Sequence, residues 1–255
     1  MTTTSNEVLL NRSGASVTIT INRPDRRNSV TLATAMRLHD VLQELVDDDG
    51  INVVLLRGNG ADFCCGADFK SDTGGGISDE NKMPIYQIPL LLHEMRAVTV
   101  AAVRGGCAGA GLGWAAACDL RIADPTAKFN SAFLDIGFSG DMSGPWSLSR
   151  ILCSSNARDI YFLPRKFGAQ EALQMGLISR IIPEAAFEEE VGTIVARLAA
   201  ARPTALHSMK ANFLDAERVG LREYVALETE RHLSNMANMG GREQAFTAYR
   251  DKRAN

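Results

Sequence analysis

Two glycine-rich turns in this sequence present backbone N–H groups that could stabilise a negatively charged oxygen. The first is Gly66-Ala67-Asp68, within FCCGADFK at residues 63–70, and the second lies among the five glycines of residues 105–113. Each follows a short apolar run, at residues 51–56 and 98–103, that indicates a buried strand. A strand that leads into a glycine turn and then a helix directs free N–H groups and the positive end of the helix dipole at one spot. Such a turn suits an anion or a developing oxyanion.

One carboxylate, Asp141, stands where it could move a proton. It lies in the segment Gly140-Asp141-Met142-Ser143-Gly144, among the apolar residues Phe133, Phe138 and Trp146. Apolar surroundings raise the pKa of a carboxyl group by desolvation, which suits a general base. An aspartate here could equally cap the helix predicted at residues 145–152. The three aromatic residues could line a pocket or belong to ordinary core packing.

Other chemistries have weaker support. The glycine cluster contains Gly111-x-Gly113-x-x-Ala116, a loose dinucleotide fingerprint, and Asp135 follows at about the spacing of a ribose-binding carboxylate. The five cysteines form no C-x-x-C pair, which predicts reduced thiols. A nucleophilic Cys64 or Cys65 has no partner histidine nearby in sequence. The four histidines lack ligand spacing, so no metal is predicted.

The elements that must position these groups follow a strand–helix–strand order. Alternating apolar residues predict strands at residues 8–10 and 17–21, and Thr31 fits the N-cap of a helix over residues 32–46. Further patterns predict helices at residues 84–97 and 114–118, a strand at 120–123, a mobile loop at 71–82, and helices beyond residue 157. This order predicts an α/β fold of right-handed βαβ units.

With both turns in view, the chain resembles the enoyl-CoA hydratase/isomerase family, or crotonase superfamily, from about residue 17 to residue 253. The resemblance rests on Gly66-Ala67-Asp68 after Phe63 and on the later pair Cys118-Asp119. It implies an α/β spiral of ββα units over residues 1–195 and a C-terminal helical trimerisation region over residues 196–255. It also implies that the thioester oxygen binds between the N–H groups of Ala67 and Ala110.

The same resemblance places Gly113 and Phe133 where the family's hydratases carry two glutamates. Hydration needs one group to activate water and another to handle a proton, and neither residue can do this. Asp141 matches the aspartate base of some family isomerases. We therefore expect isomerisation of a double bond in an unsaturated acyl-CoA through an enolate. The alternatives are a hydratase-type lyase with a non-standard acid and base, and a non-catalytic acyl-CoA-binding protein.

The resemblance also implies coenzyme A contacts and a homotrimer or hexamer. Coenzyme A would be part of the substrate, so no separate cofactor is expected. Arg26 and Arg27 could instead form a solvated basic loop, and Lys252 could be an ordinary exposed charge. The expected coenzyme A contacts are Arg26, Arg27, Asp68, Phe69, Tyr249 and Lys252.

Composition is compatible with these expectations. The chain has 255 residues and a formal net charge of −3, which argues against a nucleic-acid partner or an anionic membrane surface. The N-terminal MTTTSNE lacks the features of a signal peptide, and no apolar run is long enough to span a bilayer. We therefore expect a cytoplasmic protein.

Overall fold

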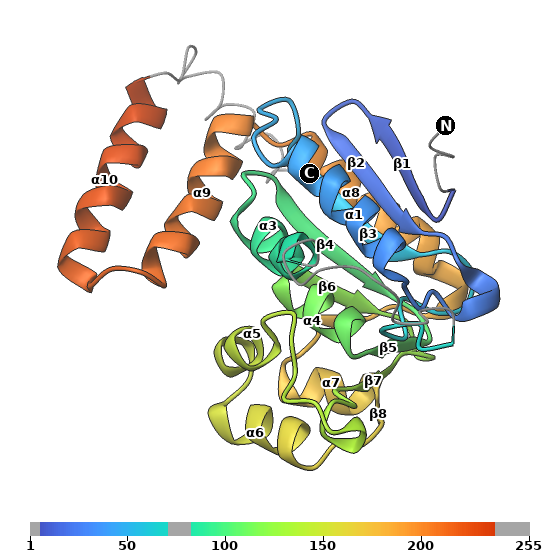
Figure 1. The fold of residues 1–255 in the computed structure, drawn as a ribbon. Coiled ribbons are helices and arrows are strands. Elements are labelled where there is room, and N and C mark those ends of the chain that lie inside the picture. The colour runs from blue at the N-terminus through green and yellow to red at the C-terminus, as the bar shows by residue number, and fades with distance from the viewer. Residues whose placement is uncertain (1–5, 71–82, 238–255) are drawn as a thin grey trace. The chain divides into compact units, whose positions relative to one another are not determined.

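The computed structural model describes residues 6–70 and 83–237 (Figure 1). The predicted loop at residues 71–82 and the tail residues Tyr249 and Lys252 lie outside the described residues. The chain divides into two compact units, Met1–Ala201 and Arg202–Asn255. No helix within the described ranges has the length and apolar character needed to cross a membrane.

A six-stranded sheet forms the centre of the first unit, and the predicted α/β class is confirmed. The first two strands form an antiparallel hairpin, and the other neighbouring strands pair in parallel. Parallel strands bring their carboxyl ends to one edge, so the turns that follow them lie near one another. In sheet order the strands are β1 (Val8–Ser13), β2 (Ser16–Ile21), β3 (Val53–Gly58), β4 (Val98–Val103), β6 (Leu120–Ala123) and β9 (Arg180–Ile181).

Both faces of this sheet are buried because alternate residues of each strand point to opposite sides. Val54 and Leu56 of β3 belong to the cluster that includes side chains of α1 (Leu32–Leu45), α3 (Ile88–Glu94) and α4 (Ala110–Ala117). Val53 and Leu55 pack instead with α8 (Phe187–Ala199). Two helical layers therefore enclose the sheet, which explains why β3 and β4 are apolar throughout (Figure 1).

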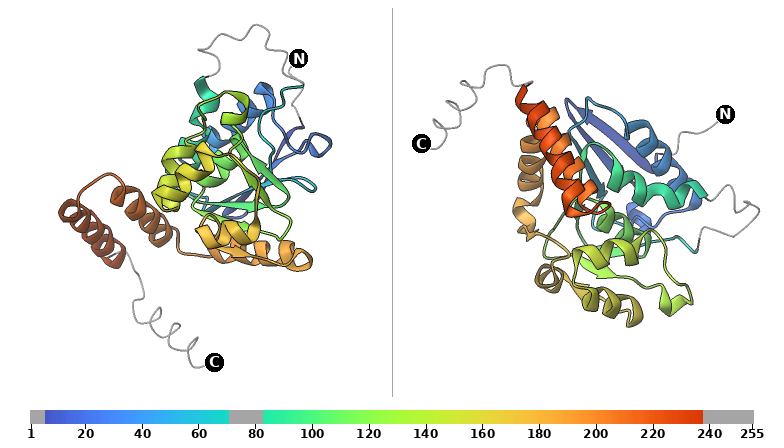
Figure 2. Two further views of the ribbon diagram at one scale, coloured as in Figure 1. Left: turned by 90° about the horizontal axis from the view of Figure 1, so that it is seen from below. Right: turned by 90° about the vertical axis from the view of Figure 1, so that its left-hand side faces the viewer.

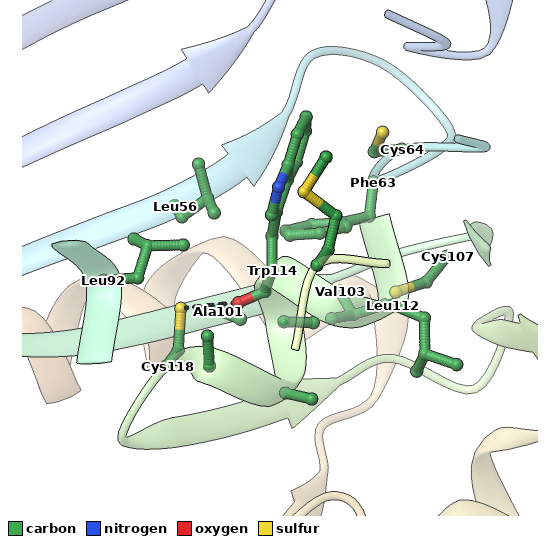
Figure 3. Close-up of a cluster of buried hydrophobic side chains, with 14 of the residues drawn as sticks. Leu56, Phe63, Cys64, Leu92, Ala101, Val103, Cys107, Leu112, Trp114 and Cys118 are labelled. Atoms are coloured by element: carbon green, nitrogen blue, oxygen red, sulfur yellow. Dashed lines mark hydrogen bonds between the residues drawn. The ribbon is translucent and has the colours of Figure 1, made fainter. Parts of the chain in front are cut away.

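Trp114 lies in the larger cluster and anchors α4 (Figure 3). Its side chain is fully buried, as is that of Phe63, and Leu56 and Leu92 belong to the same cluster. Burying each such side chain contributes about 1.5–3 kcal/mol. The Cys118 thiol donates a hydrogen bond to the Trp114 carbonyl at 3.4 Å. These contacts fix α4, and with it the glycine turn that precedes the helix.

A smaller sheet and three helices follow along the first unit. The sheet pairs β5 (Gly106–Ala108) with β7 (Lys128–Asn130), and β7 with β8 (Phe167–Gly168). Helices α5 (Gly144–Ile151) and α6 (Ser154–Phe162) lie side by side (Figures 1 and 2). The other helices are α7 (Ala169–Met175) and the 3-10 turns η1 (Pro24–Arg26), η2 (Met83–Gln87), η3 (Leu134–Ile136) and η4 (Glu184–Ala186). The second unit contains α9 (Pro203–Ala216) and α10 (Leu221–Ala237).

Several predicted boundaries are confirmed and others are wrong. The strand predicted at residues 8–10 extends to Ser13, and the strand predicted at residues 51–56 is Val53–Gly58. The β4 and β6 strands have the predicted bounds, and the Thr31 hydroxyl accepts the Thr34 N–H at 3.2 Å as the cap of α1. The predicted helix at residues 84–97 is shorter, because a 3-10 turn containing Pro84 precedes α3. Helix α4 begins at Ala110, four residues before the predicted start at Trp114.

Candidate active site

The first turn is held by a parallel bridge between Val30 and Ala67. The Val30 N–H donates to the Gly66 carbonyl at 2.9 Å, and the Asp68 N–H donates to the Val30 carbonyl at 2.9 Å. Ala67 lies between the two residues that bond to Val30. In a parallel bridge such a middle residue directs its own N–H to the side of the strand away from the bonded partner. The Ala67 N–H therefore points away from Val30, while both of its neighbours are fixed.

The second turn is formed by Gly109 and Ala110 at the start of α4. Gly109 has φ 53° and ψ −120°, a combination that glycine adopts far more easily than residues with a side chain. Its own N–H donates to the Asn130 carbonyl at 3.1 Å. Ala110 is the first helical residue, so its N–H has no acceptor within the helix.

These two turns pack directly against each other. A Cβ atom placed on Gly109 would lie 3.6 Å from Cα of Gly66, and one placed on Gly66 would lie 3.2 Å from the Ala108 carbonyl oxygen. Beside them, the Cys64 N–H donates to the Gly106 carbonyl at 3.0 Å, and the Ala108 N–H donates to the Cys64 carbonyl at 2.9 Å. The predicted donors Ala67 and Ala110 therefore stand in adjoining turns, each directly after one of the glycines in contact.

The segment that carries Asp141 packs against α4. A Cβ atom on Gly113 would lie 2.5 Å from Cβ of Met142, so this approach requires glycine. The Oδ1 atom of Asp141 is buried and has no hydrogen-bond partner in the described part of the chain. Burial raises the pKa of this carboxyl group above its ordinary value. A partly buried carboxyl group, with one oxygen unpaired within the described ranges, therefore lies beside the helix that presents Ala110.

The Asp141 side chain does not cap α5. The N-cap residue is Ser143, and no side-chain hydrogen bond caps the helix. Asp141 contributes only its backbone carbonyl, which accepts the Gly144 N–H at 3.2 Å. The cap alternative is therefore wrong for the carboxylate, which leaves that group available for chemistry.

The three predicted pocket aromatics have different surroundings. Phe133 is half-buried. It lies near the second turn, since a Cβ atom placed on Gly109 would be 4.0 Å from the Cζ atom of Phe133. Phe138 is 57% exposed and Trp146 is 42% exposed, so ordinary core packing does not account for them. The Cζ atom of Arg150 lies 3.8 Å from the centroid of the Trp146 ring. The Trp146 ring also meets the His93 ring edge-on, with ring centroids 5.0 Å apart.

Two predicted coenzyme A contacts are engaged in holding the turns. Asp68 is buried and pairs with Arg23 at 3.0 Å, so its carboxylate fixes the first turn. Arg27 pairs with Asp62 at 2.8 Å, and Asp62 also accepts the Gly106 N–H at 2.6 Å. Burial opposes ionisation of Asp62, but these two hydrogen bonds outweigh it and lower its pKa. Contact of Asp68 or Arg27 with coenzyme A stays a prediction.

The other predicted coenzyme A contacts in the described residues are exposed. Phe69 follows the first turn and is 66% exposed, and Arg26 lies on the surface of η1. These two positions are accessible to a ligand.

Three residues that support the site were missed by sequence reasoning. The Asn28 amide accepts the Arg23 N–H at 2.8 Å and donates to the Asp62 carbonyl at 2.6 Å, which joins two loops. Asp119 accepts the Thr99 N–H at 2.7 Å and so ties the end of α4 to β4. Arg23 and Asn28 lie in the segment NRPDRRN at residues 22–28, beside the predicted contacts Arg26 and Arg27, and Asp119 is the second residue of the Cys118-Asp119 pair. Their partners are distant along the chain, so only the fold shows what they hold together.

The competing chemistries find little support in the structure. Burial raises the pKa of Cys64 to about 12 and also raises the pKa of Cys65, which disfavours either thiolate. A Cβ atom on Gly111 would overlap the Cys64 carbonyl oxygen, so packing accounts for this glycine of the dinucleotide pattern. Over the described ranges, no group of three or more His, Cys, Asp or Glu residues is arranged to hold a metal ion.

Comparisons with known proteins agree with this architecture. A family model described as enoyl-CoA hydratase/isomerase matches residues 11–255. Two proteins named 4-chlorobenzoyl coenzyme A dehalogenase, both from Arthrobacter sp, are each 30% identical over 225 residues, covering 86% of this chain and 80% of the relative.

Solved structures are similar over nearly the whole chain. A putative enoyl-CoA hydratase from Streptomyces coelicolor A3(2) has a TM-score of 0.89 at 27% identity, covering 99% of this chain and 94% of that one. A putative enoyl-CoA hydratase from Thermobifida fusca YX in complex with acetoacetyl-CoA has a TM-score of 0.85 at 26% identity, covering 91% and 96%. The fold is therefore crotonase-like, and the chain belongs to the enoyl-CoA hydratase/isomerase family.

Proposed function

We propose that this protein isomerises a double bond in an unsaturated acyl-CoA thioester through an enolate. One observation carries the proposal: the turns of Ala67 and Ala110 adjoin, and the segment packed on α4 holds a buried carboxyl oxygen of Asp141 that has no partner among the described residues. Binding of acetoacetyl-CoA by a structural neighbour supports a thioester ligand. Coenzyme A enters as part of the substrate, and the proposal includes no further cofactor.

The reaction divides between the two turns and the carboxylate. The thioester oxygen accepts the N–H groups of Ala67 and Ala110, which stabilise the charge that develops there. The Asp141 carboxylate removes a proton from one carbon of the acyl chain, and the electron pair moves into the conjugated system as an enolate. The resulting carboxylic acid returns the proton to another carbon, so the double bond migrates and no atom is gained or lost.

A single base suffices for this transfer, whereas hydration needs a second group. Gly113 and Phe133 have no ionisable side chain, which supports isomerisation over hydration. The raised pKa of Asp141 also favours a group that both takes up and returns a proton.

A second candidate function is hydrolytic removal of halogen from an aromatic acyl-CoA. The specific observation in its favour is the 30% identity to two 4-chlorobenzoyl coenzyme A dehalogenases. Here the Asp141 carboxylate would form a C–O bond to the ring carbon, halide would leave with the bonding electrons, and water would hydrolyse the resulting ester. Charge passing through the ring to the thioester oxygen would use the same two N–H donors. Halide release from 4-chlorobenzoyl-CoA would favour this candidate.

The decisive experiment incubates the protein with a panel of unsaturated acyl-CoAs in deuterated water. We expect a shifted double bond or deuterium uptake, and a non-catalytic acyl-CoA-binding protein would give neither. Asp141→Asn should keep the fold and acyl-CoA binding but lose activity by about 10²–10⁴-fold. Asp135→Asn, which removes an exposed carboxylate on η3, is the matched control. Wild-type turnover in Asp141→Asn, or efficient hydration of crotonyl-CoA by the parent, would overturn the assignment.

We further propose a homotrimer or hexamer, with Tyr249 and Lys252 near the adenine end of coenzyme A. The described span of α10 contains no buried residue, and apolar side chains of the second unit such as Phe213 and Leu221 are strongly exposed. Association would cover such surface. Light scattering should therefore give a trimeric or hexameric mass, and a stable monomer at micromolar concentration would contradict the proposal.

A further inference from the structure

Two glycines flank Asp141, and both make room for Tyr161. A Cβ atom on Gly140 would lie 2.8 Å from Cε1 of Tyr161. A Cβ atom on Gly144 would overlap the Tyr161 hydroxyl oxygen. Contacts this close cannot form with a side chain at either position. The Tyr161 ring therefore packs on the backbone one residue before and three residues after Asp141.

Tyr161 is held firmly in that place. It lies near the end of α6, and its ring stacks on Phe133 with centroids 6.1 Å apart and an interplanar angle of 21°. The Ser131 hydroxyl donates to the carbonyl of the preceding residue, Ile160, at 2.7 Å. Phe133 in turn approaches Gly109 of the second turn. One aromatic stack thus connects the N–H turn with the Asp141 segment.

From this placement we propose that Tyr161 is a positioning residue for Asp141, and that its hydroxyl donates a hydrogen bond to the carboxylate in the substrate complex. The inference rests on the proposed function, since it assigns Tyr161 a role in the work of Asp141. The Tyr161 phenol supplies a donor for the Asp141 oxygen that is buried and has no other partner in the described part of the chain. The donor holds the carboxylate in one orientation toward the acyl chain.

The electrostatics of the pair support a donor role for the phenol. Burial and the nearby charge of Asp141 both raise the pKa of Tyr161, so the hydroxyl keeps its proton near neutral pH. Tyr161 is the ionisable group that α6 brings to Asp141. Helix α4 has no ionisable side chain, and Arg150 of α5 is stacked on Trp146. A hydrogen bond to a carboxylate stabilises its charged form and lowers its pKa.

The first test is Tyr161→Phe, which keeps the ring and removes the hydroxyl. Because one hydrogen bond to a charged carboxylate is lost, we expect kcat to fall by about 10- to 100-fold with KM little changed. Without the donor the Asp141 carboxyl ionises less readily, so the acid limb of the kcat profile should move to higher pH. Tyr224→Phe is the matched control, because it removes an exposed hydroxyl that bonds to Glu228 at 2.8 Å.

A purely structural role for Tyr161 would leave the pH profile of Tyr161→Phe at the wild-type position, and that result would overturn the inference. The proposed function fails separately, if Asp141→Asn remains active. Activity lost in Asp141→Asn together with an unmoved profile in Tyr161→Phe would refute only the role of Tyr161.

The second test uses Gly144 and does not depend on the pH profile. Gly144→Ala should displace the Tyr161 hydroxyl and lower kcat at least as much as Tyr161→Phe. In the Tyr161→Phe background, Gly144→Ala should lower kcat by a smaller factor than it does in the parent, because the hydroxyl oxygen that it displaces is absent there. Strictly additive losses would show that Gly144 and the hydroxyl act independently, which would contradict the proposed placement.

Discussion

Gly109→Ala tests whether backbone geometry at the second turn governs turnover. The added methyl has room, because its nearest neighbours would be Cα of Gly66 at 3.6 Å and Cζ of Phe133 at 4.0 Å. The cost is therefore conformational rather than a clash. At φ 53° and ψ −120°, an alanine residue is strained by about 1–3 kcal/mol.

That strain is relieved when the peptide that joins residues 109 and 110 rotates, which brings residue 109 into the left-handed region that alanine can adopt. Rotation turns the Ala110 N–H away from its present direction, and loss of one such donor costs about 10²–10³ in turnover. We expect Gly109→Ala to fold, to unfold at lower urea concentration, and to lose turnover by up to that factor. The assays are urea unfolding and steady-state kinetics on the acyl-CoA that the substrate panel identifies.

Gly14→Ala supplies the control, because Gly14 also has positive φ, at 57°, and a Cβ atom there would meet nothing within 4 Å. It lies in the turn between β1 and β2, so it should cost stability by about 1 kcal/mol and leave kcat unchanged. A folded Gly109→Ala variant with wild-type turnover would refute the link between this turn and catalysis.

Two further predictions concern the scaffold. Asn52→Ala should lower the free energy of unfolding in urea by about 1–3 kcal/mol, because the buried Asn52 amide donates to the carbonyls of Ala199 and Ala201 at 3.0 and 2.8 Å. In native protein a thiol reagent at pH 8 should modify the exposed Cys153 but not Cys64 or Cys107, whose pKa values burial raises; peptide mass spectrometry would locate the labels.

The sequence predicted the β4 strand well because a short apolar run closed by glycines gives a strong local signal. It placed the start of α4 too late, since Gly111 and Gly113 are poor helix formers. In the structure, tertiary packing overrides this propensity: α4 presses Gly111 on Cys64 and Gly113 on Met142. The glycines are needed for close approach, which a local pattern cannot show.

The two turns and Asp141 could be found from sequence because each belongs to a short motif. Their supporting residues could not, because their partners are distant along the chain. Asn28 reaches Asp62, and the Tyr161 ring reaches the segment around Asp141 from another helix. Such pairings depend on how the sheet and helices assemble, and no spacing rule within one segment predicts them.

Backbone strain in the Asp141 segment gives independent support for a functional role. The two residues after the carboxylate, Met142 and Ser143, both have positive φ, at 52° and 57°, although neither is glycine. Such conformations cost about 1–3 kcal/mol each and persist only where surrounding contacts impose them. Here Gly113 of α4 packs on Met142, and Tyr161 occupies the space above Gly144. The same contacts that maintain the strain also fix the backbone on either side of Asp141. A surface aspartate or a helix cap would need no such constraint, whereas a proton-transferring carboxylate must be held in one orientation relative to the acyl chain.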